Sequence, residues 1–400
     1  MRILFLSPRQ CWPPVSGAKL RDYHFARALG RRATLTYVFF SEPGGPAVTA
    51  ADLPFCRTVI AVPAPRMYSP AQIVRGLAGR WPLPAVNYTS QSMKTALAGV
   101  LQKEQFDLVH VDYINMAPYA NIFERCGATR LVYNWHNIES EVMRGYSRTS
   151  DSSMRKLYAR WTARRLATLE KRILRRAFGH VVCSERERQA LCHTVPEARI
   201  VVVENGVDTA FFEPVSNSPA GRDRLVFVGS MAYHANIDAA VWFVRSVWPA
   251  VRERLPHARL TLVGWNPAPA VLALRNEKNV EVTGTVDDVR PYYREALAAI
   301  VPLRTGGGTR LKILEAMAAG VPVVSTTLGA EGLAVSPGRQ VLIADRDQDW
   351  LEHLTSLAAK PEFWRSLAAS GLELARTRYD WEILGPSLYK TYSQWLDQAA

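Results

Sequence analysis

The chain has 400 residues, of which 48% are hydrophobic and 21% charged, and its formal net charge at neutral pH is +13. This composition is typical of a globular protein and excludes a disordered one. The chain is longer than one domain with a single hydrophobic core usually is, so two domains are expected. The opening MRILFLSP is too short an apolar run for a secretory signal, and no stretch approaches the eighteen apolar residues of a spanning helix, so a cytoplasmic location is predicted.

The first half of the chain alternates apolar runs with helical patterns. Arg2–Ser7 predicts a strand, Gly17–Leu29 a helix and Leu35–Phe40 the next strand, which together form a βαβ unit with a parallel sheet and a right-handed crossover. Further strands are expected at Thr58–Val62, Leu108–Val111, Leu131–Trp135, His180–Cys183 and Ile200–Val203. We predict a doubly wound α/β domain over residues 1–207.

A second domain is predicted over residues 208–380. The stretch Phe212–Asp223 is rich in Pro, Ser and Gly and is typical of a linker. A long helix is then expected over Ile237–Arg254. Strands are expected at Leu225–Val228, Arg259–Val263, Val280–Thr283, Ala299–Leu303, Val321–Ser325 and Val341–Ile343. The pattern therefore predicts two Rossmann-like domains in tandem, and such sheets bind ligands beyond the carboxyl ends of their strands.

The excess of positive over negative charge lies entirely in the first half of the chain. Residues 1–205 hold 29 Lys and Arg against 15 Asp and Glu, whereas residues 206–400 hold 20 against 21. The segment Met154–His180 alone has nine Lys or Arg and one Glu, with Leu166, Leu169 and Ile173 at helical spacing. Such a helix suits an anionic membrane surface, although a solvated basic face on a docked helix explains it as well. No nucleic-acid reader motif accompanies the charge, so no nucleic-acid partner is predicted.

The five cysteines are scattered without a CxxC pair, and the neighbours Cys192 and His193 lack two further ligands at zinc-site spacing. We therefore predict reduced thiols and no metal site.

The stretch TGGGTRLKILEAMAAGVPVVS, Thr305–Ser325, combines glycines with cations at the predicted start of a helix. Thr309 is a suitable N-cap, the helix is predicted over Arg310–Ala319, and Gly320 ends it. Arg310 and Lys312 in the first turn oppose the helix dipole, at about 0.3–1 kcal/mol each. A docked anion would make the interaction of these cations with the helix start favourable overall, because the free backbone amides and both cations would point at the anion.

The same stretch fits a nucleoside diphosphate. Glycines without a Cβ let the backbone approach an anion closely, and these are Gly306, Gly307 and Gly308. Glu315 lies on nearly the same helix face as Lys312 and is suited to accept hydrogen bonds from ribose hydroxyls. Taken singly, the three glycines would indicate a flexible turn, and the Lys–Glu pair would indicate an ordinary surface interaction. Their position together, between a strand and a helix, favours the phosphate site. Neither a P-loop nor the G-x-G-x-x-G dinucleotide motif is present.

The chain resembles the family 4 glycosyltransferases of the GT-B fold over essentially its whole length. RTGGGTRLKILEAMAAGVPVVST is similar to the family's C-terminal donor-site signature, in a glycine-loop branch of the family. Supporting similarities are PPVSGAKLRDYHFARAL near the start, NWHNIESE at 134–141, VVVENGVD at 201–208 and FVGSMAYHANIDAAVWF at 227–243. The tail from residue 381 to 400 resembles the terminal helix that crosses back onto the first domain in this fold.

The resemblance implies two domains facing across a cleft, with the acceptor on the first and the nucleotide-sugar on the second. It implies catalytic roles for His136, Arg310 and Lys312. The donor-site positions that it implies are Gly17, Gly229, Gly306, Gly307, Gly308, Thr309, Arg310, Leu311, Lys312 and Glu315. No metal and no cofactor are expected, because the helix dipole and side-chain cations neutralise the leaving group.

Two departures from the family pattern bear on the donor. The family commonly carries a glutamate eight residues before Glu315, where this chain has Gly307. Family members also often place Arg and Lys in a turn where this chain has Ser230 and Ala235. The variant pattern leaves the identity of the sugar open.

The expected function is retaining transfer of a sugar from a nucleotide-sugar to a lipid-linked or oligosaccharide acceptor, in bacterial envelope or exopolysaccharide synthesis. The location is then the cytoplasm, or the cytoplasmic face of the inner membrane through the segment 154–180. Two alternatives are a catalytically silent GT-B protein that binds nucleotide-sugar, and a nucleotide-sugar epimerase on the same fold.

Overall fold

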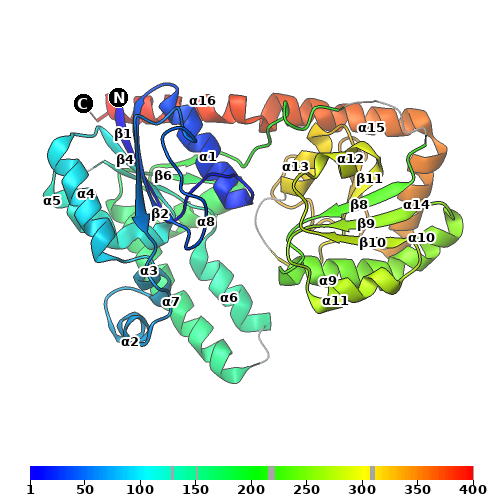
Figure 1. Cartoon of the computed structure of the whole chain (residues 1–400), viewed down its shortest axis with the longest axis horizontal. Coiled ribbons are helices and arrows are strands. Elements are labelled where there is room, and N and C mark those ends of the chain that lie inside the picture. The colour runs from blue at the N-terminus through cyan, green and yellow to red at the C-terminus, as the bar shows by residue number, and fades with distance from the viewer. Residues whose placement is uncertain (128–129, 150–151, 215–220, 307–310, 400) are drawn as a thin grey trace. The chain divides into compact units, whose positions relative to one another are not determined.

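The computed structural model describes residues 1–127, 130–149, 152–214, 221–306 and 311–399. The chain forms two compact units (Figure 1). The first contains Met1–Glu204 and the C-terminal residues from Leu384, and the second contains Asn205–Ile383. Each unit is built on its own parallel sheet with helices packed against it, as the alternation of apolar runs and helical patterns predicts.

The first sheet has seven strands in the order β3-β2-β1-β4-β5-β6-β7, all paired in parallel. The strands are β1 Arg2–Ser7, β2 Thr34–Ser41, β3 Thr58–Pro63, β4 Leu108–Asp112, β5 Leu131–Asn134, β6 Gly179–Val182 and β7 Ile200–Val202. The central strands are buried almost throughout, because helices cover both faces of a parallel sheet. The order reverses between β1 and β4, which creates a switch point beside Ser7 and Asp112.

The helices of the first unit are α1 Gly17–Gly30, α2 Pro70–Ala78, α3 Leu83–Asn87, α4 Gln91–Lys103, α5 Ala120–Arg125, α6 Glu139–Thr149, α7 Ser153–Arg176 and α8 Glu185–Thr194, with a 3₁₀ turn η1 at Ile114–Tyr119. The basic segment forms α7, whose Leu166, Leu169 and Ile173 are buried. Helices α6 and α7 pack along each other and project from the sheet (Figure 1).

The second sheet has six parallel strands in the order β10-β9-β8-β11-β12-β13. They are β8 Arg224–Val228, β9 Arg259–Val263, β10 Val280–Gly284, β11 Ala296–Val301, β12 Val323–Ser325 and β13 Leu342–Ile343. The helices are α9 His234–Trp242, α10 Trp248–Arg254, α11 Pro269–Leu272, α12 Arg290–Arg294, α13 Leu311–Ala318, α14 Asp347–Ala359 and α15 Pro361–Leu374, with a 3₁₀ turn η3 at Ala273–Asn276 and a π turn η4 at Ala375–Tyr379. The switch point here lies between β8 and β11.

Three predicted elements of this unit differ from the structure by more than one residue. The strand expected at Val321–Ser325 begins two residues later, as β12 Val323–Ser325. The strand expected at Ala299–Leu303 starts three residues earlier, because β11 pairs with β8 from Ala296 onward and its ALAA run fits a buried strand. The helix expected over Ile237–Arg254 is interrupted by a π turn, η2 at Phe243–Val247. Pro249, at the start of α10, has no N–H for the carbonyl four residues before it, which favours a local change of helical pitch.

The last helix, α16 Trp381–Asp397, begins among the residues of the second unit and continues in the first. Within the first unit the Tyr392 hydroxyl lies 2.6 Å from Nδ1 of the buried His110. A Cβ at Gly179 would lie 2.3 Å from the Trp395 ring, so this glycine makes room for the helix. The helix is therefore an integral part of the core of the first unit.

None of the five cysteines forms a disulfide. Among the described residues, no helix has the length and apolar character needed to cross a membrane.

Candidate active site

In the second unit, three of the predicted donor residues, Gly229, Lys312 and Glu315, are described beside the switch point between β8 and β11. Gly229 follows β8, and α13, which carries Lys312 and Glu315, lies between β11 and β12. The Nζ of Lys312 donates a hydrogen bond to Oδ1 of Asn236 at 2.8 Å and lies 4.4 Å from the centroid of the Phe227 ring. Two fixed neighbours thus hold the ammonium group at the end of the sheet.

Gly229 leaves room for the ends of two side chains, Lys312 and Asn236. A Cβ at position 229 would lie 2.8 Å from Nζ of Lys312 and 2.9 Å from Nδ2 of Asn236. That amide in turn donates to the carbonyl of Ser230 at 2.8 Å. The absence of a side chain at Gly229 therefore leaves space for the lysine head group. Gly229 and Lys312, which were predicted separately from the sequence, thus lie side by side in the structure.

Glu315 lies one turn after Lys312 and is half-buried. Its Oε2 is 3.3 Å from the hydroxyl of the buried Tyr293, which lies also 3.4 Å from the carbonyl oxygen of Lys312. Burial raises the pKa of the Glu315 carboxyl, against the opposing effects of the Tyr293 hydroxyl and the Lys312 charge. Tyr293 thus fixes the carboxylate from one side.

Four of the predicted donor-site residues, Gly307, Gly308, Thr309 and Arg310, lie outside the described residues. Gly306 is described and has φ +100°, a conformation that favours glycine. Leu311 begins α13 and packs partly against the core of the unit. In the described part of this stretch, Lys312 is the cation placed beside Gly229.

In the first unit, His136 belongs to a buried cluster at the carboxyl ends of β1, β4 and β5. Its Nε2 lies 2.9 Å from Oδ1 of Asp112, the last residue of β4, and 3.5 Å from Oδ1 of Asp22 on α1. The Ser7 hydroxyl donates to Oδ2 of Asp22 at 3.1 Å, and Nη1 of Arg9 lies 3.9 Å from the same oxygen. Both carboxylates are fully buried.

The charges in this cluster stabilise a protonated imidazole. Burial lowers the pKa of His136, but Asp112 and Asp22 raise it more, so that the pKa rises to about 9. Burial and the charge of Asp112 raise the pKa of Asp22 to about 6, while His136 and Arg9 hold the pKa of Asp112 below its usual range despite burial. At neutral pH His136 is therefore a cation and a hydrogen-bond donor.

A second layer of contacts holds Asp112 in place. Nδ2 of Asn134, at the end of β5, donates to Oδ1 of Asp112 at 2.7 Å. The fully buried Arg21 donates to Oδ1 of Asn134 from Nε at 3.1 Å and from Nη2 at 2.9 Å, and to the carbonyl of Val203 at 2.9 Å. Hydrogen bonds thus connect four side chains in succession, from Arg21 through Asn134 and Asp112 to His136.

Asp22, Asp112 and His136 each offer one atom that can ligate a metal, and these atoms lie within 4.8 Å of one another. A cation there would compete with the proton on His136 and with the nearby Arg9 guanidinium. The electrostatics of the cluster therefore favour a proton over a metal at neutral pH.

Gly17, the remaining predicted residue, is the first residue of α1 and is exposed. The N-cap Ser16 accepts from the amide of Lys19 through its side chain. Arg21 and Asp22 follow on the same helix, so α1 carries both the predicted glycine and two members of the buried cluster.

Two family models match the chain in succession. The one described as Glycosyltransferase Family 4 matches residues 15–211, and the one described as Glycosyl transferases group 1 matches residues 222–360. The chain belongs to the family 4 glycosyltransferases. The first of these matches contains Asp22, Asp112 and His136, and the second contains Gly229, Lys312 and Glu315.

Curated relatives of this glycosyltransferase match parts of it. A D-inositol 3-phosphate glycosyltransferase of Actinosynnema mirum is 29% identical over 223 residues, which are 49% of this chain and 52% of the relative. An uncharacterized 44.6 kDa protein in the cps region of Klebsiella pneumoniae is 24% identical over 174 residues, 42% of this chain and 45% of the relative. The chain thus spans about half the length of the curated relatives it matches.

Solved structures confirm the GT-B fold of two Rossmann-like units. Sucrose-phosphate synthase from Thermosynechococcus elongatus has a TM-score of 0.74 at 20% identity, and the match covers 100% of both chains. The Anabaena protein HepE, solved in complex with UDP-glucose, has a TM-score of 0.67 at 16% identity and covers 98% of this chain and 100% of its own. At these identities the likeness concerns the fold.

Sequence reasoning missed Asp22, Asp112, Arg21 and Asn134 in the first unit and Asn236 and Tyr293 in the second. One signal was available, because Asp112 and Asn134 end neighbouring buried strands and therefore meet at one edge of the sheet.

The raised pKa of His136 predicts a pH-dependent stability. Because its pKa is higher in the folded chain, its contribution is complete below its ordinary pKa of 6.5 and is lost as the pH rises through about 9. The loss is expected to be on the order of 2–3 kcal/mol. The difference in Tm between the wild type and His136→Gln, compared at pH 7 and pH 9.5, measures it. A Tm difference that stays constant over this range would contradict the assigned charge.

Proposed function

We propose that the protein transfers a sugar from a nucleoside-diphosphate sugar to a hydroxyl group of a lipid-linked or polysaccharide acceptor, with retention at the anomeric carbon. The observation that carries the proposal is the placement of Lys312, held by Asn236 in the space left by Gly229, with Glu315 one turn further on. A fixed ammonium group suits a diphosphate, and a carboxylate nearby suits the ribose hydroxyls.

In the proposed reaction, the bond between the anomeric carbon and the β-phosphate oxygen breaks, and the acceptor oxygen bonds to the same face of that carbon. The proton of the acceptor hydroxyl passes to the departing phosphate. Lys312, together with Arg310 and the start of α13, stabilises the negative charge that grows on the nucleoside diphosphate. His136 donates a hydrogen bond to the transferred sugar. No metal and no cofactor take part in this proposal.

Proteins similar to this one support the class of donor and the setting. HepE was solved with UDP and with UDP-glucose, and one relative lies in a cps region. We place the protein in bacterial envelope or exopolysaccharide synthesis, with the first unit binding the acceptor and the second the donor.

The same proposal locates the protein at the cytoplasmic face of the membrane, through the segment 154–180. Exposed apolar side chains accompany the cations of α7, since Met154 is 82% exposed and Leu157 69%. Nearby apolar residues on α6 and α2 are also exposed, among them Val142, Tyr146, Val74 and Leu77. A surface that combines cations with apolar side chains suits an anionic bilayer.

Sedimentation with phosphatidylglycerol vesicles tests the membrane contact. We expect vesicle binding that weakens as the salt concentration rises. The variant with Met154 and Leu157 both changed to serine should bind the vesicles more weakly than the wild type at every salt concentration. Equal sedimentation of the wild type and this variant would remove the segment from the proposal.

The donor is tested by a thermal-shift screen with UDP, GDP, ADP and dTDP, followed by mass spectrometry of reactions with the corresponding sugars. We expect one base to raise Tm and its sugar to be transferred. Stabilisation without transfer or donor hydrolysis over a range of acceptors favours the silent GT-B alternative, which the glycine at position 307 motivates. Conversion of the free donor into an epimer without an acceptor favours the epimerase.

A further inference from the structure

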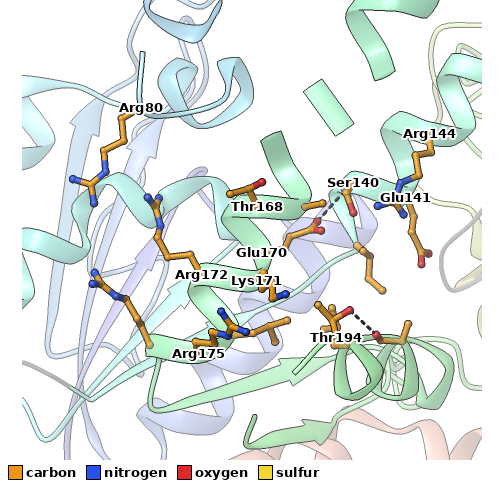
Figure 2. Close-up of a pocket in the computed structure, with 16 residues that line it drawn as sticks. Arg80, Ser140, Glu141, Arg144, Thr168, Glu170, Lys171, Arg172, Arg175 and Thr194 are labelled. Atoms are coloured by element: carbon orange, nitrogen blue, oxygen red, sulfur yellow. Dashed lines mark hydrogen bonds between the residues drawn. The ribbon is translucent and has the colours of Figure 1, made fainter. Parts of the chain in front are cut away.

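A cavity of about 710 Å³ lies in the first unit between α6, α7 and α8. Figure 2 shows its lining, in which residues of α7 lie opposite residues of α6 and α8 and Arg80, from the segment after α2, completes one side. Six cations line it: Arg80, Arg144, Lys171, Arg172, Arg175 and Arg176. The cavity therefore concentrates positive charge in a concave site.

The lining contains two carboxylates, Glu141 and Glu170. Each has a partner outside the six cations, and the charge of Arg144 also acts on the Glu170 carboxylate. Oε2 of Glu141 is 2.9 Å from Nη1 of Arg186, which is not part of the lining. The buried Glu170 accepts a hydrogen bond through Oε1 from the backbone amide of Ser140 at 2.9 Å (Figure 2). Across the part of the chain that the structure describes, none of the six cations forms an ion pair with a carboxylate.

Two of these cations, Arg80 and Arg172, lie over the ring of Trp81. The Arg172 guanidinium lies 4.3 Å from the centroid of the Trp81 ring. Arg165, on the same helix, donates to the carbonyls of Gly76, Leu77 and Gly79, and so fastens the end of α2 to α7 just before Arg80. Burial and the positive charges of Arg80 and Arg176 lower the pKa of Arg172. The structure thus holds like charges close together, at an energetic cost that a bound anion would offset.

We propose that this cavity binds the phosphate groups of a phosphorylated ligand. A phosphate offers the oxygen acceptors that several guanidinium groups can share, and the volume accommodates more than one phosphate group. The site belongs to the first unit and uses no residue of the Gly229–Lys312 site, so it is separate from the proposed donor site. The phosphate can belong to a soluble compound or to a lipid head group.

The test is calorimetry with inorganic pyrophosphate on the full chain. The cavity variant carries Lys171→Gln and Arg175→Gln, two exposed positions of α7 where glutamine preserves the helix. The matched control carries Arg155→Gln and Arg160→Gln, which remove the same charge from exposed positions of α7 outside the lining. All variants are compared in a Lys312→Ala background, which weakens pyrophosphate binding at the proposed donor site.

We expect saturable pyrophosphate binding in the Lys312→Ala background, about tenfold or more weaker in the cavity variant and unchanged in the control. Absence of saturable binding, or an equal loss in both double variants, would overturn the proposal. Neither result bears on the donor site, which is judged by nucleotide binding to the chain with Lys312 intact.

The source of the phosphate is then determined with vesicles of phosphatidylglycerol and of phosphatidylcholine. If the cavity variant loses more binding to phosphatidylglycerol than the control does, a lipid head group supplies the phosphate. If both variants lose the same amount while pyrophosphate still distinguishes them, the ligand is a soluble phosphorylated compound.

Discussion

Replacing His136 by glutamine is expected to lower the rate of sugar transfer about a hundredfold or more, and to leave nucleotide binding unchanged. The imidazole is charged at neutral pH because Asp112 and Asp22 face it in a buried site. Glutamine keeps a hydrogen-bond donor of similar reach but loses the charge. The rate of transfer at saturating donor and the Kd of the nucleoside diphosphate, measured on the same preparation, separate the two effects.

The matched control is His193→Gln, which makes the same replacement at an exposed position on α8 of the same unit. It is expected to transfer sugar at the wild-type rate. Asp112→Asn tests the positioning role of Asp112, since the pH at which activity declines on the alkaline side should then shift downward from about 9. A His136→Gln variant with wild-type activity would exclude the imidazolium from the reaction.

Replacing Lys312 by alanine is expected to weaken binding of a nucleoside diphosphate about tenfold to a hundredfold, and to weaken binding of the monophosphate much less. The reason is that Asn236 holds the ammonium group in the space left by Gly229 at the end of the sheet, where a second phosphate is expected. Glu315→Ala should instead weaken both nucleotides, because the carboxylate is assigned to the ribose that they share. Calorimetry with the mono- and diphosphate of the preferred base measures both.

Lys278→Ala is the control for the lysine, because this side chain is exposed in the same unit and away from the strand ends of the site. It should bind both nucleotides as the wild type does. If Lys312→Ala and Glu315→Ala both retained wild-type affinity for the mono- and the diphosphate, the donor site would have to lie elsewhere.

The fold could be predicted closely from the sequence, because each strand of a parallel sheet is a compact apolar run whose position is clear even without partners. β1 has the predicted bounds, and β9 does too. The prediction failed where small residues obscure the pattern, as in the ALAA run that opens β11. It also failed at η2, because a π turn depends on how Pro249 is accommodated within a long helix.

The candidate site was only partly predictable. A local pattern can identify Lys312, Glu315 and His136, since each lies in a characteristic run of neighbours. It cannot identify Asp22 as a partner of His136, because the two are 114 positions apart and meet only through the order of β1, β4 and β5. The charge of His136 is likewise a property of the folded cluster, and no neighbour in the sequence predicts it.

The path of α16 has a consequence for engineering and for the evolution of this chain. The first unit is not one continuous piece of sequence, because its core includes Tyr392 against His110 and Trp395 against Gly179. A chimaera that exchanges the second unit, Asn205–Ile383, must therefore exchange an internal segment and retain the original tail. Recombination at a single junction near residue 204 would separate this helix from the core with which it was selected.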